Sequence, residues 1–98
     1  MLIPKSSALE KKISEMGTVW EYDSPSKLFS LATALIDGRF PAERRSVNTE
    51  CEEVYYVLSG SGTVHSEKGE IYWVEGNRLS LVLVNAPKWF PEQHRIVD

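Results

Sequence analysis

The fold is decided by residues 53–85, which read EVYYVLSGSGTVHSEKGEIYWVEGNRLSLVLVN. Runs rich in β-branched and aromatic residues (EVYYVL, TVH, IYWV and RLSLVLVN) alternate here with SGSG, SEKGE and EGN, each of which contains glycine. Such a pattern predicts four short strands joined by turns. Strands this short and closely spaced are typical of a small antiparallel sandwich or barrel, and not of a βαβ fold.

The N-terminal residues carry helix signals. Ser7 and Glu10 fit a capping box, the apolar residues that follow recur at helical spacing, and Gly17 can end a helix. These signals predict a short helix over residues 6–17, which at about three turns would need a packing partner.

Residues 18–36 are predicted to be extended. Residues 18–22, TVWEY, have the composition of a short strand. Residues 27–36 fit a helical face by their leucines, but read with period two they also fit a strand that ends at the turn pair Asp37-Gly38. The tail, residues 86–98, contains Pro87 and Pro91, so we expect it to wrap along the outside of the barrel and to join no central strand.

Composition excludes several classes of protein. The 98 residues suffice for a single domain, and 11 Lys+Arg against 14 Asp+Glu give a net charge of −3 without long single-sign blocks. This charge argues against a nucleic-acid partner, and the apolar runs are far shorter than the roughly 20 residues that span a bilayer. We expect a cytoplasmic protein, because no export signal is visible and the single cysteine excludes an intrachain disulfide.

One segment resembles the first motif of a known superfamily. Residues 38–64, GRFPAERRSVNTECEEVYYVLSGSGTV, resemble the cupin motif G-x(5)-H-x-H-x(3,4)-E-x(6)-G, with Glu53 and Gly60 at matching positions. The two histidine positions of the motif fall on Ser46 and Asn48. The metal-binding half of the motif is therefore absent.

The resemblance continues downstream. EKGEIYWVEG looks like the end of the second cupin motif, P-x-G-x(2)-H-x(3)-N, with Gly69 kept and Tyr72 at the histidine position. The closing NAPKWFPEQHRIVD is similar to the tail of small single-domain cupins with degenerate metal sites. The resemblance implies a double-stranded β-helix, a jelly-roll barrel, in which residues 27–36 are a strand. One departure is that cupins place a further pair of short strands between the motifs; the barrel is either truncated here, or the sequence lacks a loop.

By this resemblance, we expect one cupin-like domain over residues 1–98, with a helix at about 6–17, the barrel at about 18–85 and the tail at 86–98. It also implies a homodimer, because small cupins commonly pair.

The candidate ligand-binding residues are Asn48, Glu53, Tyr55 and Tyr72. An inward Glu53 in an apolar barrel must be paired or protonated, and we expect its partner among Arg39, Arg44 and Arg45 or a tyrosine. Aromatic side chains with a few polar groups are how small barrels build ligand pockets. Glu53 and Tyr72 are also the candidate acid and base of an enzyme.

A standard metal site is not expected, because the family site needs three histidines and a glutamate and this chain has two histidines in total. A noncanonical site for Zn, Fe, Mn or Ni would have to use Cys51, Glu53 and His65. Catalysis by the Cys51 thiol is disfavoured because the neighbouring glutamates oppose formation of the thiolate.

Three functions compete. The preferred one is a cupin that binds a small polar molecule without a standard metal site. The second is a cupin enzyme, either a sugar isomerase or epimerase using Glu53 and Tyr72, or a metal-dependent oxygenase using Cys51, Glu53 and His65. The third is a non-catalytic dimerisation module.

Overall fold

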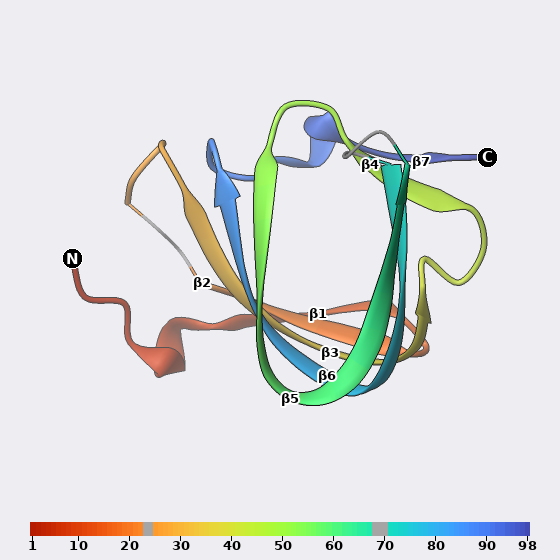
Figure 1. Cartoon of the computed structure of the whole chain (residues 1–98). Helices are drawn as coiled ribbons and strands as arrows, with labels where there is room; N and C mark the ends of the chain where they lie inside the picture. Colours follow the sequence, from red (N-terminus) through yellow and green to blue (C-terminus); the bar gives the residue numbers. More distant parts are fainter. Residues whose placement is uncertain (23–24, 68–70) are drawn as a thin grey trace.

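The structure, a computed structural model, describes residues 1–22, 25–67 and 71–98. These residues form one seven-stranded antiparallel sheet that curls into half of a barrel (Figure 1). The strands are β1 (Leu9–Ser14), β2 (Gly17–Tyr22), β3 (Ser30–Phe40), β4 (Arg45–Asn48), β5 (Glu52–Glu67), β6 (Ile71–Ala86) and β7 (His94–Val97). The predicted all-β barrel-type fold is confirmed.

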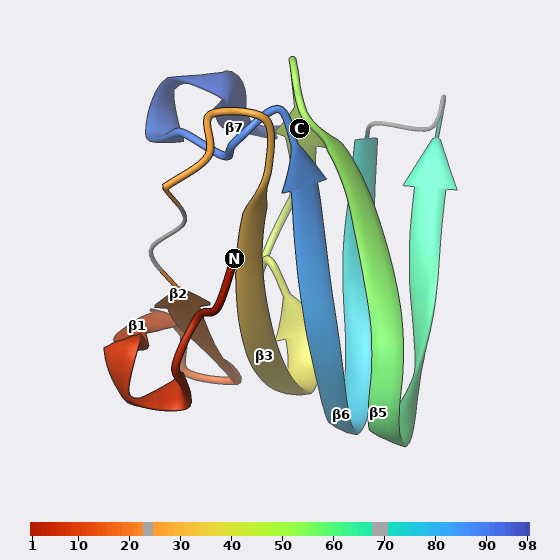
Figure 2. The same ribbon diagram turned by 90° about the vertical axis from the view of Figure 1, so that its left-hand side faces the viewer.

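The sheet is organised around β6. The strand order is β1-β2-β3-β6-β4-β7, and β5 pairs with β6 as well. Figure 2 shows β3, β6 and β5 side by side, with the hairpin of β1 and β2 beyond β3. One face of this curled sheet is concave, and that face carries the candidate site.

The long strands β5 and β6 replace the four short strands that the sequence predicts. They pair from Glu52 opposite Ala86 to Glu67 opposite Ile71. The turns predicted at SGSG and EGN are therefore wrong, since both segments lie within continuous strands. The predicted SEKGE turn extends over residues 68–70, which lie outside the described residues.

Glycine is needed where this two-stranded ribbon bends. Gly60 has a φ of 78°, and a Cβ placed on it would lie 2.0 Å from the carbonyl oxygen of Arg78. A Cβ on Gly76 would lie 2.4 Å from the carbonyl oxygen of Ile36. The glycines that look like turn residues therefore let the backbones approach closely at a bend, with register shifts in β5 nearby.

The helix predicted over residues 6–17 is also wrong. A 3₁₀ turn, η1 (Lys5–Ser7), is followed directly by β1, which pairs with β2. Leu9 and Ile13 fit a strand with period two as well as a helix, and both line the concave face together with Lys11. Pairing with β2 anchors this short segment in the sheet, whereas an isolated helix of about three turns is only marginally stable.

Two other predicted boundaries shift. The strand predicted at 27–36 begins at Ser30 and continues to Phe40, because Asp37-Gly38 forms a bulge instead of a turn. The tail contains a second 3₁₀ turn, η2 (Pro91–Gln93), and then β7, which pairs with β4 at the end of the strand order. The tail thus joins the sheet at its edge and not at its centre.

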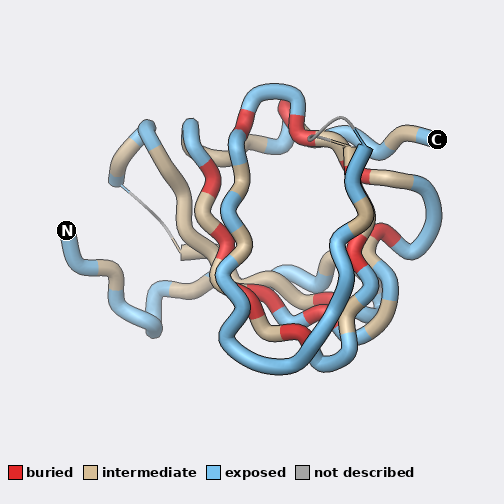
Figure 3. Tube along the Cα trace, in the orientation of Figure 1, coloured by how far each residue is buried: buried red, intermediate tan, exposed pale blue. Residues whose placement is uncertain are grey.

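The core is small and lies along the paired strands β3 and β6. Its buried members are Ala34, Ile36, Tyr72, Val74, Leu79, Leu81 and Leu83. Most of β5 is exposed, as the pale blue course of this strand in Figure 3 shows. Within the described residues, no helix is long and apolar enough to cross a bilayer.

Candidate functional site

The concave face holds a pocket of about 920 Å³. Its volume is within the range of small-molecule sites, although it is open to solvent. One wall is apolar and contains Val19, Ala32, Ala34, Ile36, Phe40 and Leu83. The opposite end is polar and aromatic and contains Glu53, Tyr55, Tyr72, Asn85, Trp89 and His94.

The predicted ligand-binding residues come together at the polar end. Glu53, Tyr55 and Tyr72 line the main pocket, and all three also line a second hollow of about 400 Å³. Asn48 lines only this second hollow, where its side-chain amide donates to Glu53 Oε1 at 3.5 Å. Glu53 therefore lies between the two hollows, within reach of a ligand in either.

Glu53 is held by neutral donors and not by a cation. Its carboxylate receives side-chain hydrogen bonds from Asn85, Tyr55, Asn48 and Tyr72. Burial raises the pKa of this carboxyl above its ordinary value of 4.5, and the four hydrogen bonds only partly oppose that rise. The site thus holds a carboxyl that keeps its proton to higher pH than a free glutamate does.

The expected arginine partner for Glu53 is wrong. Arg39 lies over the Trp73 ring, 5.2 Å from its centroid, and donates to the carbonyl oxygen of Arg44. Arg44 lies 3.6 Å from the carboxylate of Asp98, and Arg45 makes an ion pair with Glu67. Each of the three side chains therefore has a partner other than Glu53, although Arg44 lines the pocket, and the tyrosine alternative holds instead.

The two tyrosines stay protonated. Their rings meet edge to face, with centroids 6.4 Å apart. Burial and the nearby Glu53 carboxylate raise the pKa of Tyr72 to about 12, and burial raises the pKa of Tyr55 well above 10. Both hydroxyls thus act as hydrogen-bond donors at neutral pH.

No sequence pattern pointed to Gln93, the residue that holds this end of the site together. Gln93 is fully buried; its Oε1 accepts from the Cys51 amide at 3.2 Å and its Nε2 donates to Asn48 Oδ1 at 3.1 Å. Its backbone carbonyl accepts from the amide and the hydroxyl of Thr49 at 2.8 and 2.7 Å. Gln93 therefore fixes the segment that leads from β4 into β5 and orients Asn48 toward Glu53.

The tail adds pocket residues that sequence reasoning placed outside the barrel. His94 Nε2 lies 3.1 Å from Ser46 Oγ, and burial lowers the pKa of the imidazole. The ring of Trp89 lies 6.1 Å from that of His94, and the Trp89 amide donates to Ser30 Oγ at 3.0 Å. A neutral histidine and an indole thus flank the polar end.

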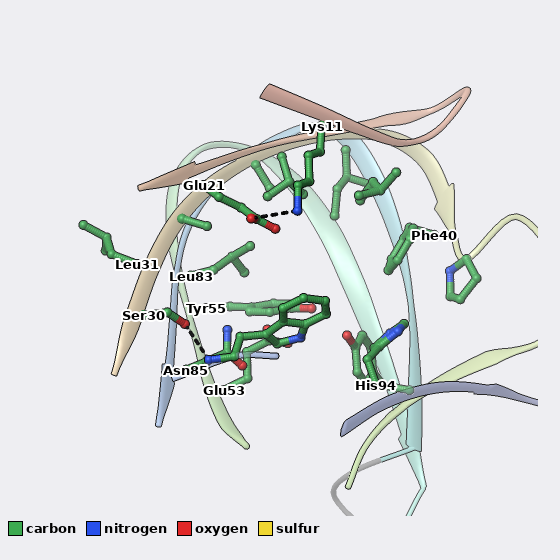
Figure 4. A pocket seen from close by; sticks show the side chains of 18 of the residues that line it. Lys11, Glu21, Ser30, Leu31, Phe40, Glu53, Tyr55, Leu83, Asn85 and His94 are labelled. Atoms are coloured by element: carbon green, nitrogen blue, oxygen red, sulfur yellow. Dashed lines mark hydrogen bonds and ion pairs between the residues drawn. The ribbon is translucent and has the colours of Figure 1, made fainter. Parts of the chain in front are cut away.

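An ion pair lies on the far side of the pocket from Glu53 (Figure 4). Lys11 Nζ on β1 is 3.0 Å from Glu21 Oε2 on β2, and both side chains are partly exposed. Sequence reasoning missed this pair because residues 6–17 were expected to form a helix.

The alternative metal ligands Cys51, Glu53 and His65 are not brought together. His65 lies on the other face of the sheet, where it pairs with Glu75 at 2.9 Å and stacks on Trp73. Cys51 is buried, with its thiol donating to the carbonyl oxygen of Pro87 at 3.3 Å. Across residues 1–22, 25–67 and 71–98, no group of three or more His, Cys, Asp or Glu side chains could hold a metal ion.

The Cys51 thiol is also poorly suited to nucleophilic catalysis. Burial, and then the charges of Glu53 and Glu50, raise its pKa.

Comparison with known proteins identifies the fold. No family model and no curated protein sequence matches the chain. Among solved structures, variants of Streptomyces Pac13 with uridine match 99% of this chain and 89–90% of theirs, with TM-scores of 0.77–0.78 at 15–16% identity. The chain shares the barrel fold of Pac13. A further Pac13 structure, described as that of a unique nucleoside dehydratase, matches equally well, with a TM-score of 0.77 at 16% identity, over 99% of this chain and 90% of that one. At such low identity the likeness to Pac13 establishes the fold alone.

The buried position of Glu53 predicts a pH-dependent stability. Its pKa is raised in the folded state, so its contribution to stability is complete below about 4.5 and is lost as the pH rises through the folded-state value. Glu53→Gln cannot ionise, so we expect its free energy of unfolding to rise relative to that of the parent protein as the pH rises through this interval. Urea unfolding across a pH series measures the difference.

The matched control is Glu50→Gln, which removes an exposed carboxylate outside both hollows. The contrary result is that the free energies of unfolding of Glu53→Gln and of the parent protein differ by the same amount at every pH. That result would show that Glu53 ionises as freely as a surface residue.

Proposed function

We propose that this chain is a small cupin that binds a nucleoside-like molecule in its main pocket without a standard cupin metal site. The observation that carries the proposal is the placement of buried Tyr72 and Asn85 and half-buried Glu53 and Tyr55 opposite an apolar wall in one open pocket. The cupin assignment is supported by the motif positions of Glu53 and Gly60, together with the barrel fold shared with Pac13.

The two ends of the pocket match the two halves of a nucleoside. The wall formed by small and branched side chains of β3, including Ala32 and Ala34, offers a flat apolar surface for a heteroaromatic base. The polar end offers acceptor oxygens of Glu53, Tyr55 and Tyr72 to sugar hydroxyls, because the tyrosine O–H groups are directed to the Glu53 carboxylate. The uridine in the Pac13 structures supports this ligand class.

Uridine is therefore expected to bind and to stabilise the folded chain. At a concentration about 100 times its Kd, it should raise the free energy of unfolding by about 2.7 kcal/mol. Ala32→Trp, which places an indole in the pocket, should abolish the shift, while Thr33→Trp on the opposite face of the same strand should keep it. Thermal unfolding with and without uridine measures both variants, and circular dichroism confirms that each is folded.

The proposal fails if uridine does not raise the melting temperature of the parent protein. It also fails if Ala32→Trp and Thr33→Trp respond to uridine alike.

The raised pKa of Glu53 supports a second candidate, an acid–base enzyme. A carboxyl with a raised pKa can take a proton from a bound ligand and return it, and the neutral His94 nearby can act as a second proton-transfer group. Isomerisation, epimerisation and loss of water all require such transfers. The oxygenase alternative has no support of this kind, because Cys51, Glu53 and His65 are apart.

For the enzyme candidate, we expect deuterium to enter a C–H position of a bound uridine nucleoside in D₂O, or a product to form. Glu53→Gln should slow either process by about 100-fold or more, because it removes the group that moves the proton. Proton NMR of the nucleoside follows the reaction, with Glu50→Gln as the control. Exchange that persists in Glu53→Gln would assign the proton transfer to another group.

We further propose that two copies of the chain pair along β5. Among the described strands, β5 pairs only with β6, so its other edge presents unpaired backbone groups. Val54, Tyr56 and Leu58 on this half of the strand are 60, 66 and 55% exposed. An antiparallel pair of identical edges obeys a two-fold axis, so a second copy fits this edge.

Light scattering is expected to give the mass of a dimer at micromolar concentration. Tyr56→Lys places a charge in the middle of the apolar segment and should shift the mass toward that of the monomer. Thr63→Lys, on the distant half of β5, is the matched control. A monomeric parent protein at this concentration would refute the dimer.

A further inference from the structure

The polar end of the pocket contains an acceptor atom with no partner. Asn85 lies on the concave side of β6, 6% exposed, and its side chain lines the main pocket (Figure 4). Its Oδ1 has no hydrogen-bond partner among the described residues. Leaving a buried carbonyl unsatisfied costs about 1–3 kcal/mol, so such an atom in a pocket calls for an explanation.

The orientation of the Asn85 amide is fixed by its neighbour. The register places Ser30, Asn85 and Glu53 in one row across β3, β6 and β5. The Asn85 amide group donates to the Glu53 carboxylate, which in its ionised form can only accept. Turning the amide around would set Oδ1 against that carboxylate, so Oδ1 is the atom left free for another donor.

Ser30 does not supply that donor. It accepts a hydrogen bond from the Trp89 amide at 3.0 Å, which ties the tail to this end of the row. Trp89 lines the same pocket, so a ligand that reaches Asn85 also meets an aromatic side chain.

We propose that Asn85 is a specificity-determining residue that accepts a hydrogen bond from a ligand N–H or O–H group. The inference rests on the proposed nucleoside function and names the ligand group that the polar end recognises. Two kinds of group in uridine are proposed as the donor, a secondary hydroxyl of the ribose (2′ or 3′) or the imide N–H of the base. Ligands without such a donor leave Oδ1 desolvated and unpaired, and the site therefore selects against them.

The test is a cycle of ligand and protein changes measured by calorimetry. The ligands are uridine, 2′-deoxyuridine, 3′-deoxyuridine and 3-methyluridine, each of the last three lacking one donor. The parent protein should bind one of these three about 10-fold or more weaker than uridine. Asn85→Leu, which has the same branching and number of side-chain heavy atoms but no acceptor, should weaken uridine binding about 10-fold or more and abolish the discrimination between uridine and that analogue.

Asn85→Asp is the control that distinguishes loss of the acceptor from general damage to the binding site. It keeps acceptor oxygens, so it should retain the discrimination even if repulsion from Glu53 weakens all four ligands. One analogue should bind the parent protein more weakly than uridine but bind Asn85→Leu as well as uridine does. The group that this analogue lacks identifies the donor as a hydroxyl or as the imide.

Other outcomes distinguish the inference from the function it rests on. Equal weakening of all four ligands by Asn85→Leu refutes the inference and leaves nucleoside binding intact. If uridine does not bind the parent protein, nucleoside binding is refuted. Ribose is then compared with 2-deoxyribose: a preference for ribose that Asn85→Leu abolishes upholds the acceptor role of Asn85, and the absence of such a preference refutes it.

Discussion

The bend in the ribbon of β5 and β6 is the constraint on which the rest of the structure depends. The two strands pair along their whole lengths, so the second half of each can return only if both backbones fold over at one place. Gly60 and Gly76 make that fold possible, because a side chain at either position would overlap a facing carbonyl. The bend sets the N-terminal half of β5, with Glu53 and Tyr55, against the half of β6 that carries Tyr72, and so creates the polar end of the pocket.

A buried carboxylate without a cation is the chemical consequence of this arrangement. An arginine beside Glu53 would lower its pKa and make it an ordinary structural anion. Neutral donors solvate the carboxylate only in part, so the proton affinity stays raised. Gln93 contributes to this balance without touching Glu53, since it holds Asn48 in the position from which Asn48 donates to the carboxylate. The site is thus suited to binding polar groups and to exchanging a proton, two roles that the same geometry serves.

Sequence reasoning succeeded where a pattern had one physical meaning. The β-branched and aromatic content of 53–58 and 78–85 predicted strands correctly, and the alternation of side chains along a strand placed Glu53 and Tyr55 on one face. It failed where a residue type has two uses. Glycine serves turns and also close approach at a bend, and Gly60 belongs to the second class.

The remaining site residues depend on contacts that no local pattern encodes. Asn85 is indistinguishable from any residue at the end of a strand until its register opposite Glu53 is known. Gln93 and His94 lie in a segment whose prolines argue against a sheet position, yet β7 pairs with β4, so that His94 lines the pocket and Gln93 holds Asn48 behind it. Long-range pairing of this kind determines which polar residues are buried, and burial is what distinguishes a site residue from a surface one.

The short connection between β5 and β6 also shapes the site. Only residues 68–70 separate the two strands, so the connection leaves no room for another strand pair, and in the described chain β5 keeps a free edge. Two hollows meet at Glu53. The main pocket opens on the concave side of the sheet, and the second hollow opens beside Val64 and Ser66. A ligand can therefore extend past the carboxylate in either direction. Recognition then has to come from fixed polar atoms, such as those of Asn85 and Tyr72, because an open cavity excludes little by shape.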